Sequence, residues 1–152
     1  MAAYQHMLVA IDLTDESKQV LDRARDEAQR YGAKLSLVHV IKPFMQVYGG
    51  YGVMGGVDYS GQMATLEIDL QKQAREQLAK IAQELGVPAE RTHALNGSPA
   101  VEIHGLVESS GADLLIIGTH GQHGLGLLLG STANAVLHGT KCDVLVVRVH
   151  AD

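Results

Sequence analysis

The sequence predicts an α/β fold, Rossmann-like, in which one domain is built on a doubly wound five-stranded parallel sheet of order 3-2-1-4-5 with helices on both faces. Short apolar runs of strand length alternate along the chain with stretches of helical apolar spacing, which is the pattern of repeated strand-helix-strand units. The length of 152 residues and the 46% of apolar residues suit one core of ordinary size. Right-handed crossovers then favour this strand order.

The first part of the chain supplies one strand-helix-strand unit. Its expected elements are a strand at 6–11, a helix at 17–31 and a strand at 35–41. Thr14 or Asp15 is placed to cap the helix, because short polar side chains before a helix accept hydrogen bonds from its first amides. Gly32 ends the helix, since glycine readily takes the left-handed conformation found at helix ends.

Residues 42–62 show neither helical nor strand periodicity and are rich in glycine and tyrosine, which predicts a long flexible loop. If the loop is a lid, Tyr48, Tyr51 and Tyr59 would cover a bound ligand or a partner surface. The alternative is a disordered excursion between a strand and a helix. The sequence favours neither.

The rest of the chain supplies the other elements. In chain order the sequence predicts a helix at 63–85, an edge strand at 91–95, a helix from 99 to 111, a strand at 114–117, a helix at 133–138 and a strand at 142–149. Ser98 is placed to cap the helix that begins with Pro99. The apolar positions of the longest helix share one face and are expected to be buried: Leu66, Leu70, Ala74, Leu78, Ile81 and Leu85.

A glycine-rich stretch follows the strand at 114–117. It contains five glycines and then two hydroxyl residues: Gly118, Gly121, Gly124, Gly126 and Gly130, followed by Ser131 and Thr132. Glycine lets a backbone approach a ligand closely, and the first amides of a helix lack partners, so this arrangement predicts an anion site with phosphate as its ligand. The alternative is that the glycines only turn the chain. The stretch matches neither GxGxxG nor GxxxxGK[ST], and it contains no lysine.

Asp12 follows the first strand directly. In open parallel sheets ligands bind at the carboxyl ends of the strands, where the order of connection reverses, and in the predicted order this point lies between strands one and four. Asp12 would therefore lie beside the loop that starts at Gly118, although the two are distant in the sequence. Its carboxylate can accept hydrogen bonds from a ribose or a base, or help to hold a metal. The alternative is a helix-capping carboxylate.

Composition excludes several classes of protein. The formal net charge of −5 and the scattered lysines and arginines argue against nucleic-acid binding, which needs a basic surface. The single cysteine, Cys142, rules out an intramolecular disulfide and fits a reducing compartment, and its place before an apolar run indicates a strand residue. No apolar run is long enough to span a membrane and no basic segment precedes the first strand, so we expect a cytoplasmic protein.

Several motifs together resemble the universal stress protein family. They are AIDLTDES after the first strand, LSLVHV in the second, then NGSPAVEI, ADLLIIGTHGQHGLGLLLGSTANAVL and CDVLVVRV, in this order. The resemblance covers essentially the whole chain, residues 1–152, apart from the glycine-tyrosine loop. It implies the predicted fold, and in one branch of the family it implies ATP binding.

The ATP-binding branch carries G-x2-G-x9-G-[ST] at the glycine stretch. Gly118 and Gly121 match the first two glycines, but Gly130 follows after eight residues, one fewer than the motif has. With nine residues counted, Ser131 and Thr132 take the last two positions. A second branch, which resembles the founding member, lacks the glycine loop and does not bind ATP detectably. The present loop is richer in glycine than the second branch and shorter than the first, so it lies between the two branches.

The resemblance assigns residues to the two ends of an adenine nucleotide. At the adenosine end it places Asp12 and the backbone of Ala10, Ile11 and Val40. At the phosphates it places Gly118, Gly121, Gly130, Ser131 and Thr132. His120 and His123 are the loop side chains that can add charge near neutral pH; they would bond phosphate oxygens, or else they are exposed loop histidines. His39 is expected to be a satisfied core residue.

The sequence therefore predicts a cytoplasmic protein that binds ATP, ADP or AMP, with magnesium, and acts as a nucleotide-dependent switch or protective factor in the stress response. Nucleotide would order residues 42–62 and 119–129 and so change the surface shown to a protein partner.

The family also pairs through its last strand, here Val144 to Val149, which predicts a homodimer because an apolar edge strand invites pairing. Two alternatives stay open: a family member without ATP that acts through protein contacts, and a slow ATP hydrolase. Rapid hydrolysis is not expected, since the loop has no lysine or arginine.

Overall fold

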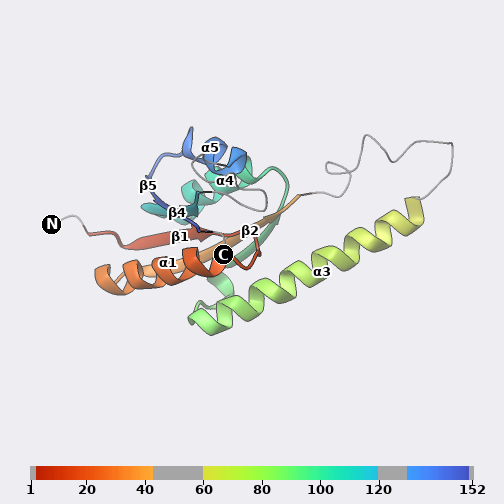
Figure 1. The fold of residues 1–152 in the computed structure, drawn as a ribbon, viewed down its shortest axis with the longest axis horizontal. Helices are drawn as coiled ribbons and strands as arrows, with labels where there is room; N and C mark the ends of the chain where they lie inside the picture. The colour runs from red at the N-terminus through yellow and green to blue at the C-terminus, as the bar shows by residue number, and fades with distance from the viewer. Residues whose placement is uncertain (1–2, 43–59, 120–129, 151–152) are drawn as a thin grey trace.

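The protein is described from a computed structural model that places residues 3–42, 60–119 and 130–150. Its strands form one parallel sheet in the order β3-β2-β1-β4-β5, as predicted (Figure 1). The strands are β1 His6–Ala10, β2 Lys34–Ile41, β3 Thr92–Asn96, β4 Leu114–Gly118 and β5 Asp143–Val147. The helices are α1 Ser17–Tyr31, α3 Ser60–Leu85, α4 Pro99–Ser110 and α5 Ser131–Leu137, with a short 3₁₀ helix, η2, at Ala89–Arg91.

Helices cover both faces of the sheet (Figure 1). One apolar cluster joins α1 and the end of α3 to one face, where Met7, Leu37 and Ile116 are fully buried. The other cluster joins α4 and α5 to the opposite face, around Leu8 and Leu115. Successive strand residues alternate between the two clusters because neighbouring side chains of a strand point to opposite faces. This is the doubly wound arrangement that the sequence predicts.

The elements lie within three residues of their predicted bounds, and Gly32 ends α1 in the predicted left-handed conformation, but the predicted side-chain bonds at the helix starts are not made. The residue before α1 is Glu16, and no side chain caps this helix. Thr14 instead donates from its amide and hydroxyl to Asp12, so both side chains belong to the preceding turn. Ser98 does stand before α4, with Pro99 as the first helical residue, but its side chain makes no capping bond.

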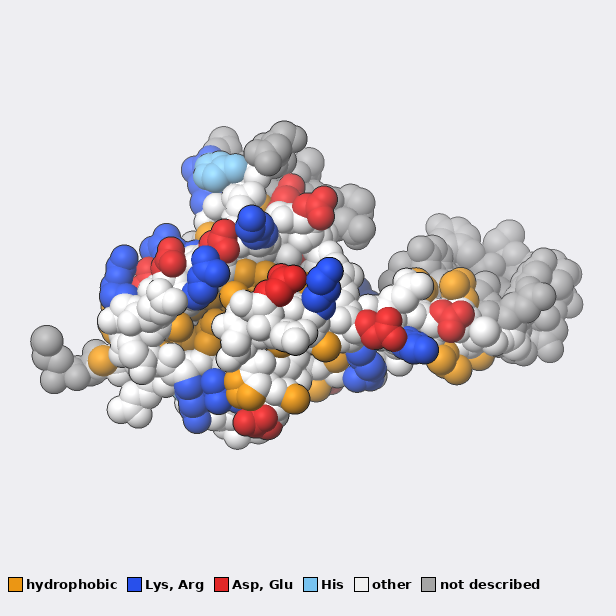
Figure 2. Space-filling model, turned by 90° about the horizontal axis from the view of Figure 1, so that it is seen from below, with side chains coloured by type: hydrophobic (Ala, Val, Ile, Leu, Met, Phe, Trp, Pro, Cys, Tyr) orange, Lys and Arg blue, Asp and Glu red, His pale blue; other side chains and the backbone are white. Residues whose placement is uncertain are grey.

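The buried stripe predicted for α3 is wrong for the first half of the helix. Leu78 is 1% exposed and Ala82 is buried, whereas Leu66 and Leu70 are each 45% exposed. The helix is longer than the sheet it covers, so its first half extends beyond the body of the protein (Figure 1). Hydrophobic side chains are visible on this extension in Figure 2. Of the loop predicted at 42–62, residues 43–59 lie outside the described residues, and α3 already begins at Ser60.

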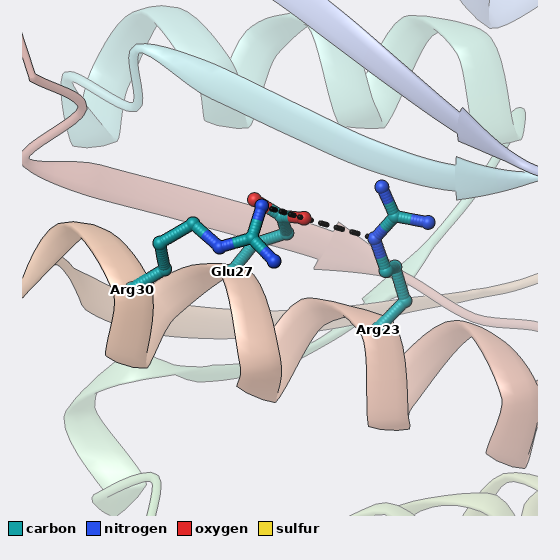
Figure 3. Close-up of polar contacts among 3 residues, drawn as sticks. All are labelled: Arg23, Glu27 and Arg30. Atoms are coloured by element: carbon teal, nitrogen blue, oxygen red, sulfur yellow. Dashed lines mark hydrogen bonds and ion pairs between the residues drawn. The ribbon is translucent and has the colours of Figure 1, made fainter.

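One charged side chain of α1 is buried. Glu27 is 6% exposed, and its Oε1 lies 2.9 Å from Nε of Arg23 and 3.6 Å from Nη1 of Arg30. Both arginines are on the same helix and reach Glu27 from either side (Figure 3). Two cations from exposed positions thus compensate a carboxylate that faces the sheet, as a buried charge requires. Among the described helices, none has the length and apolar character needed to cross a membrane.

Candidate functional site

A cavity of about 540 Å³ opens at the carboxyl ends of the strands. It lies where the strand order reverses between β1 and β4, and β2, α1, α4 and α5 also contribute to its walls. Cavities of roughly 300–1,000 Å³ at such switch points are typical small-molecule sites. Parallel strands bring these segments together because all their carboxyl ends lie at the same edge of the sheet.

The structure gathers predicted residues from four parts of the chain around this cavity. Those that line it are Ala10, Ile11, Asp12, Val40, Gly118, Gly130, Ser131 and Thr132. His120, Gly121 and His123 lie outside the described residues. The juxtaposition of Asp12 with the two ends of the glycine loop, expected from the strand order, is therefore present.

The Asp12 carboxylate forms part of a tight turn. Its Oδ1 accepts the amide N–H of Thr14 at 3.1 Å and the Thr14 hydroxyl at 2.7 Å. Leu13 between them has a φ of 63°, a left-handed conformation that is rare for leucine. Helix α1 begins only at Ser17, so Asp12 does not cap it. Asp12 is exposed at the cavity and its Oδ2 takes no partner from the described residues.

His39 ties β2 to the end of β1 beside the cavity. Its Nδ1 lies 2.8 Å from the carbonyl oxygen of Ile11, which can only accept, so Nδ1 carries the proton and Nε2 is an acceptor in the neutral ring. Burial lowers the pKa of His39, against the opposing effects of the Ile11 carbonyl and the Asp12 charge, so the ring is neutral at pH 7. The expected hydrogen bond is present, but the side chain also lines the cavity, which the sequence did not predict.

Thr119 holds the two ends of the glycine loop together. Its amide donates to the Val147 carbonyl at 2.9 Å, its carbonyl accepts from the Gly130 amide at 2.7 Å, and its Oγ1 accepts from the Val149 amide at 3.0 Å. The helix after the loop, α5, begins at Ser131, two residues earlier than predicted. Ser131 and Thr132 are exposed, and they meet the cavity at the start of this helix.

The cavity has an apolar part and a charged part. Val38, Ile103, Ile117 and Val136 supply buried apolar side chains. Asp12, Glu16 and Lys42 supply the charged side chains among the lining residues. Sequence reasoning missed Lys42, although its position directly after β2 could have indicated it. Within the described ranges, no group of histidine, cysteine and acidic side chains is suited to hold a metal.

Comparisons with known proteins agree on one family. The profile of the universal stress protein family matches residues 3–148. Universal stress protein A homolog 1 of Coxiella burnetii is 41% identical over 145 residues, which cover 95% of this chain and 96% of that protein. The solved structure of universal stress protein UspA from Lactobacillus plantarum has a TM-score of 0.77 and 22% identity, and the likeness covers 97% of this chain and all of the other. A universal stress protein solved in complex with cAMP has a TM-score of 0.58 and 25% identity, over 97% of this chain and 98% of that one.

Proposed function

The chain belongs to the universal stress protein family, and we propose that it binds an adenine nucleotide in the cavity between β1 and β4 and acts as a regulatory or protective factor in the stress response. The observation that carries this proposal is the convergence of Asp12 with both ends of the glycine loop on one cavity. A fold-level likeness alone would leave the ligand open.

The residues present fit the parts of such a ligand. The apolar side chains of Val38, Ile103 and Ile117 suit the faces of a base, and the open oxygen of Asp12 suits an amino or hydroxyl group. The hydroxyls of Ser131 and Thr132 suit phosphate oxygens. Magnesium would accompany the phosphates. The similar protein solved with cAMP supports the class of ligand, and it makes the number and arrangement of phosphates a question for the experiment.

A nucleotide in this cavity would connect elements that are far apart in the sequence. Its adenosine end would contact the turn after β1, and its phosphates would contact the start of α5. Binding would stabilise the arrangement in which these elements face each other, and that differential affinity is what a ligand-dependent switch requires. The loops expected to respond, 42–62 and 119–129, lie largely outside the described residues.

Small molecules released by denaturing freshly purified protein would be identified by mass spectrometry. The stripped protein would then be titrated by calorimetry with ATP, ADP, AMP and cAMP, each with and without magnesium. We expect micromolar binding of at least one of the four nucleotides. The double change Ser131→Ala and Thr132→Ala should weaken that binding, because it removes two hydroxyls that would contact phosphate. A clean extract with no binding of any of the four would reject the proposal in favour of a protein-interaction module. Release of ADP, AMP or pyrophosphate over hours would instead favour the slow hydrolase.

We also propose a homodimer that forms through β5. In the described sheet β5 pairs only with β4, so it is an edge strand, and its central residues Val144, Leu145 and Val146 are half-buried. The strand ends at Val147, two residues before the predicted end. Pairing would cover an edge that otherwise invites aggregation. Sedimentation equilibrium of the wild type should give twice the chain mass of 16.2 kDa. The Leu145→Asp variant should sediment as a monomer. A monomer at high concentration would contradict this.

A further inference from the structure

We infer that Thr14 is a positioning residue for the ligand: it occupies one oxygen of Asp12 and leaves the other to accept a hydrogen bond from an amino or hydroxyl group of the ligand. This inference rests on the proposed nucleotide site and adds to it a residue that selects the ligand by its donor group.

The hydrogen bonds around Asp12 are one-sided. Thr14 donates twice to Oδ1, through its amide at 3.1 Å and its hydroxyl at 2.7 Å. No described residue donates to Oδ2. An ionised carboxylate can only accept, and both lone pairs of Oδ1 are now used. The remaining oxygen at the cavity therefore suits an N–H or O–H group, and it disfavours a carbonyl, an ether or a phosphate oxygen.

The turn that carries Asp12 is held from several sides. The Ile11 amide donates to the Val38 carbonyl at 3.0 Å, and the Ile11 carbonyl accepts from His39 at 2.8 Å. The side chain of Gln77 on α3 donates to the Leu13 carbonyl at 3.4 Å. The left-handed backbone of Leu13 is unfavourable for a residue with a side chain, and such a conformation persists only where its surroundings determine it.

The next turn fixes Thr14 itself. Its carbonyl accepts the Ser17 amide at 3.0 Å and the Ser17 hydroxyl at 2.6 Å. Because these bonds hold the backbone of Thr14 without its hydroxyl, replacing the hydroxyl by a methyl group removes one contact to Asp12 and leaves the turn in place. Thr14→Val is therefore a nearly isosteric test of positioning, and Thr14→Ser restores the hydroxyl.

A donor at this place can come from two parts of an adenine nucleotide. The exocyclic amino group of the base is one source and a ribose hydroxyl is the other. ITP replaces the amino group by a carbonyl, and 2′-deoxy-ATP and 3′-deoxy-ATP each remove one hydroxyl. These three analogues, compared with ATP, identify which group meets Asp12.

The test is calorimetric titration of the wild type, Thr14→Val and Thr14→Ser with ATP and the three analogues. We expect the wild type to bind one analogue about tenfold more weakly than ATP, because that analogue lacks the donor. Thr14→Val should bind ATP about fivefold more weakly and should lose most of this discrimination, while Thr14→Ser should recover both. Thr92→Val is the matched control, since it removes a hydroxyl bond to the Pro88 carbonyl before the start of β3.

Three results would overturn the inference. If Thr14→Val keeps the wild-type affinities for all four nucleotides, the hydroxyl does not position Asp12. If Thr14→Val weakens all four equally and Thr14→Ser does not recover binding, the role of Thr14 is merely structural. If the wild type binds no nucleotide, the proposed function fails, and a crystal structure of Thr14→Val then decides the positioning by itself: an unchanged Asp12 rotamer refutes it, and a rotated carboxylate supports it.

Discussion

The two ends of the sheet use the same kinds of polar side chain in opposite ways. At the amino end both oxygens of Asp113 accept backbone amides, those of Gln5 and His6, at 2.9 and 3.0 Å. Both ring nitrogens of His6 are also bonded, to the Ser110 carbonyl and the Ser36 hydroxyl. At the carboxyl end Asp12 and His39 are bonded differently. Among the described residues each makes its hydrogen bonds through one atom, Oδ1 of Asp12 and Nδ1 of His39, and each has a second polar atom beside the cavity.

The difference separates structural from ligand-binding polar groups. A polar group that is fully bonded inside the protein contributes to stability and has no capacity left for a ligand. A group that is bonded through only one of its polar atoms is oriented by those bonds, and its other polar atom can still bind a ligand. We therefore expect changes at the fully bonded Asp113 and His6 to alter stability, and changes at Asp12, which has an oxygen without a partner among the described residues, to alter mainly binding.

The largest effect is expected for Asp113→Ala. The change leaves the Gln5 and His6 amides without their acceptor and should lower the free energy of unfolding by about 2 kcal/mol. Urea unfolding measures it. Asp26→Ala, an exposed aspartate of α1, is the control and should change stability by less than about 0.5 kcal/mol. An altered nucleotide affinity in Asp113→Ala would show that a fully bonded group at the amino end also affects binding.

Asp12→Ala should have the reverse effect. We expect about tenfold weaker nucleotide binding, equal to about 1.4 kcal/mol, because the ligand loses its acceptor. The free energy of unfolding should change by less than about 1 kcal/mol, since the carboxylate is exposed. Asp15→Ala removes the same charge from the same turn, away from the cavity lining, and should bind as the wild type does. If both changes weaken nucleotide binding equally, Asp12 acts only through its negative charge and does not accept a hydrogen bond from the ligand.

Acid should destabilise the protein through His6. Burial, followed by the charge of Lys34, lowers the pKa of His6. The folded state therefore binds fewer protons at His6 than the unfolded state does. The contribution of His6 to the free energy of unfolding is constant above about pH 6.5 and falls as the pH drops from there toward the lower folded pKa. The slope from one histidine is at most about 1.4 kcal/mol per pH unit. Urea unfolding from pH 5 to 8 should show a shallower fall for His6→Gln than for the exposed-site control His138→Gln, and equal slopes would contradict this assignment.

The smallest effect is expected for Thr119→Val, which tests whether hydrogen bonding or position in the sheet decides the role of a polar residue. Thr119 is at the cavity end, but its hydroxyl, amide and carbonyl are all bonded inside the protein. It should therefore behave as a structural residue, with a loss of about 1 kcal/mol in the free energy of unfolding and a nucleotide affinity within about threefold of the wild type. Thr119→Ser should be neutral. A large loss of affinity at wild-type stability would show that full bonding does not exclude a binding role.

The sequence predicted the strand order and the meeting of Asp12 with Gly118 and Gly130, because both follow from apolar runs and crossover handedness. It could not predict which half of α3 is buried, since periodicity identifies a helix face and says nothing of the width of the sheet beneath it. It also missed the left-handed Leu13, because that conformation depends on bonds from residues distant in the sequence such as His39 and Gln77.

Helix α3 has a mechanical consequence of its own. Its second half is anchored on the sheet, and the Gln77 side chain touches the turn beside the cavity, while the first half extends away from the body (Figure 1). From Gln77 to Gly61 the helix is about 24 Å long, so a tilt of about 10° at Gln77 moves its start by about 4 Å. Spin labels on the extended half of α3 and on α1, measured with and without nucleotide, would record such a movement. The helix is thus held at Gln77, which contacts the residue next to Asp12, and the half that extends from there carries apolar side chains into the solvent.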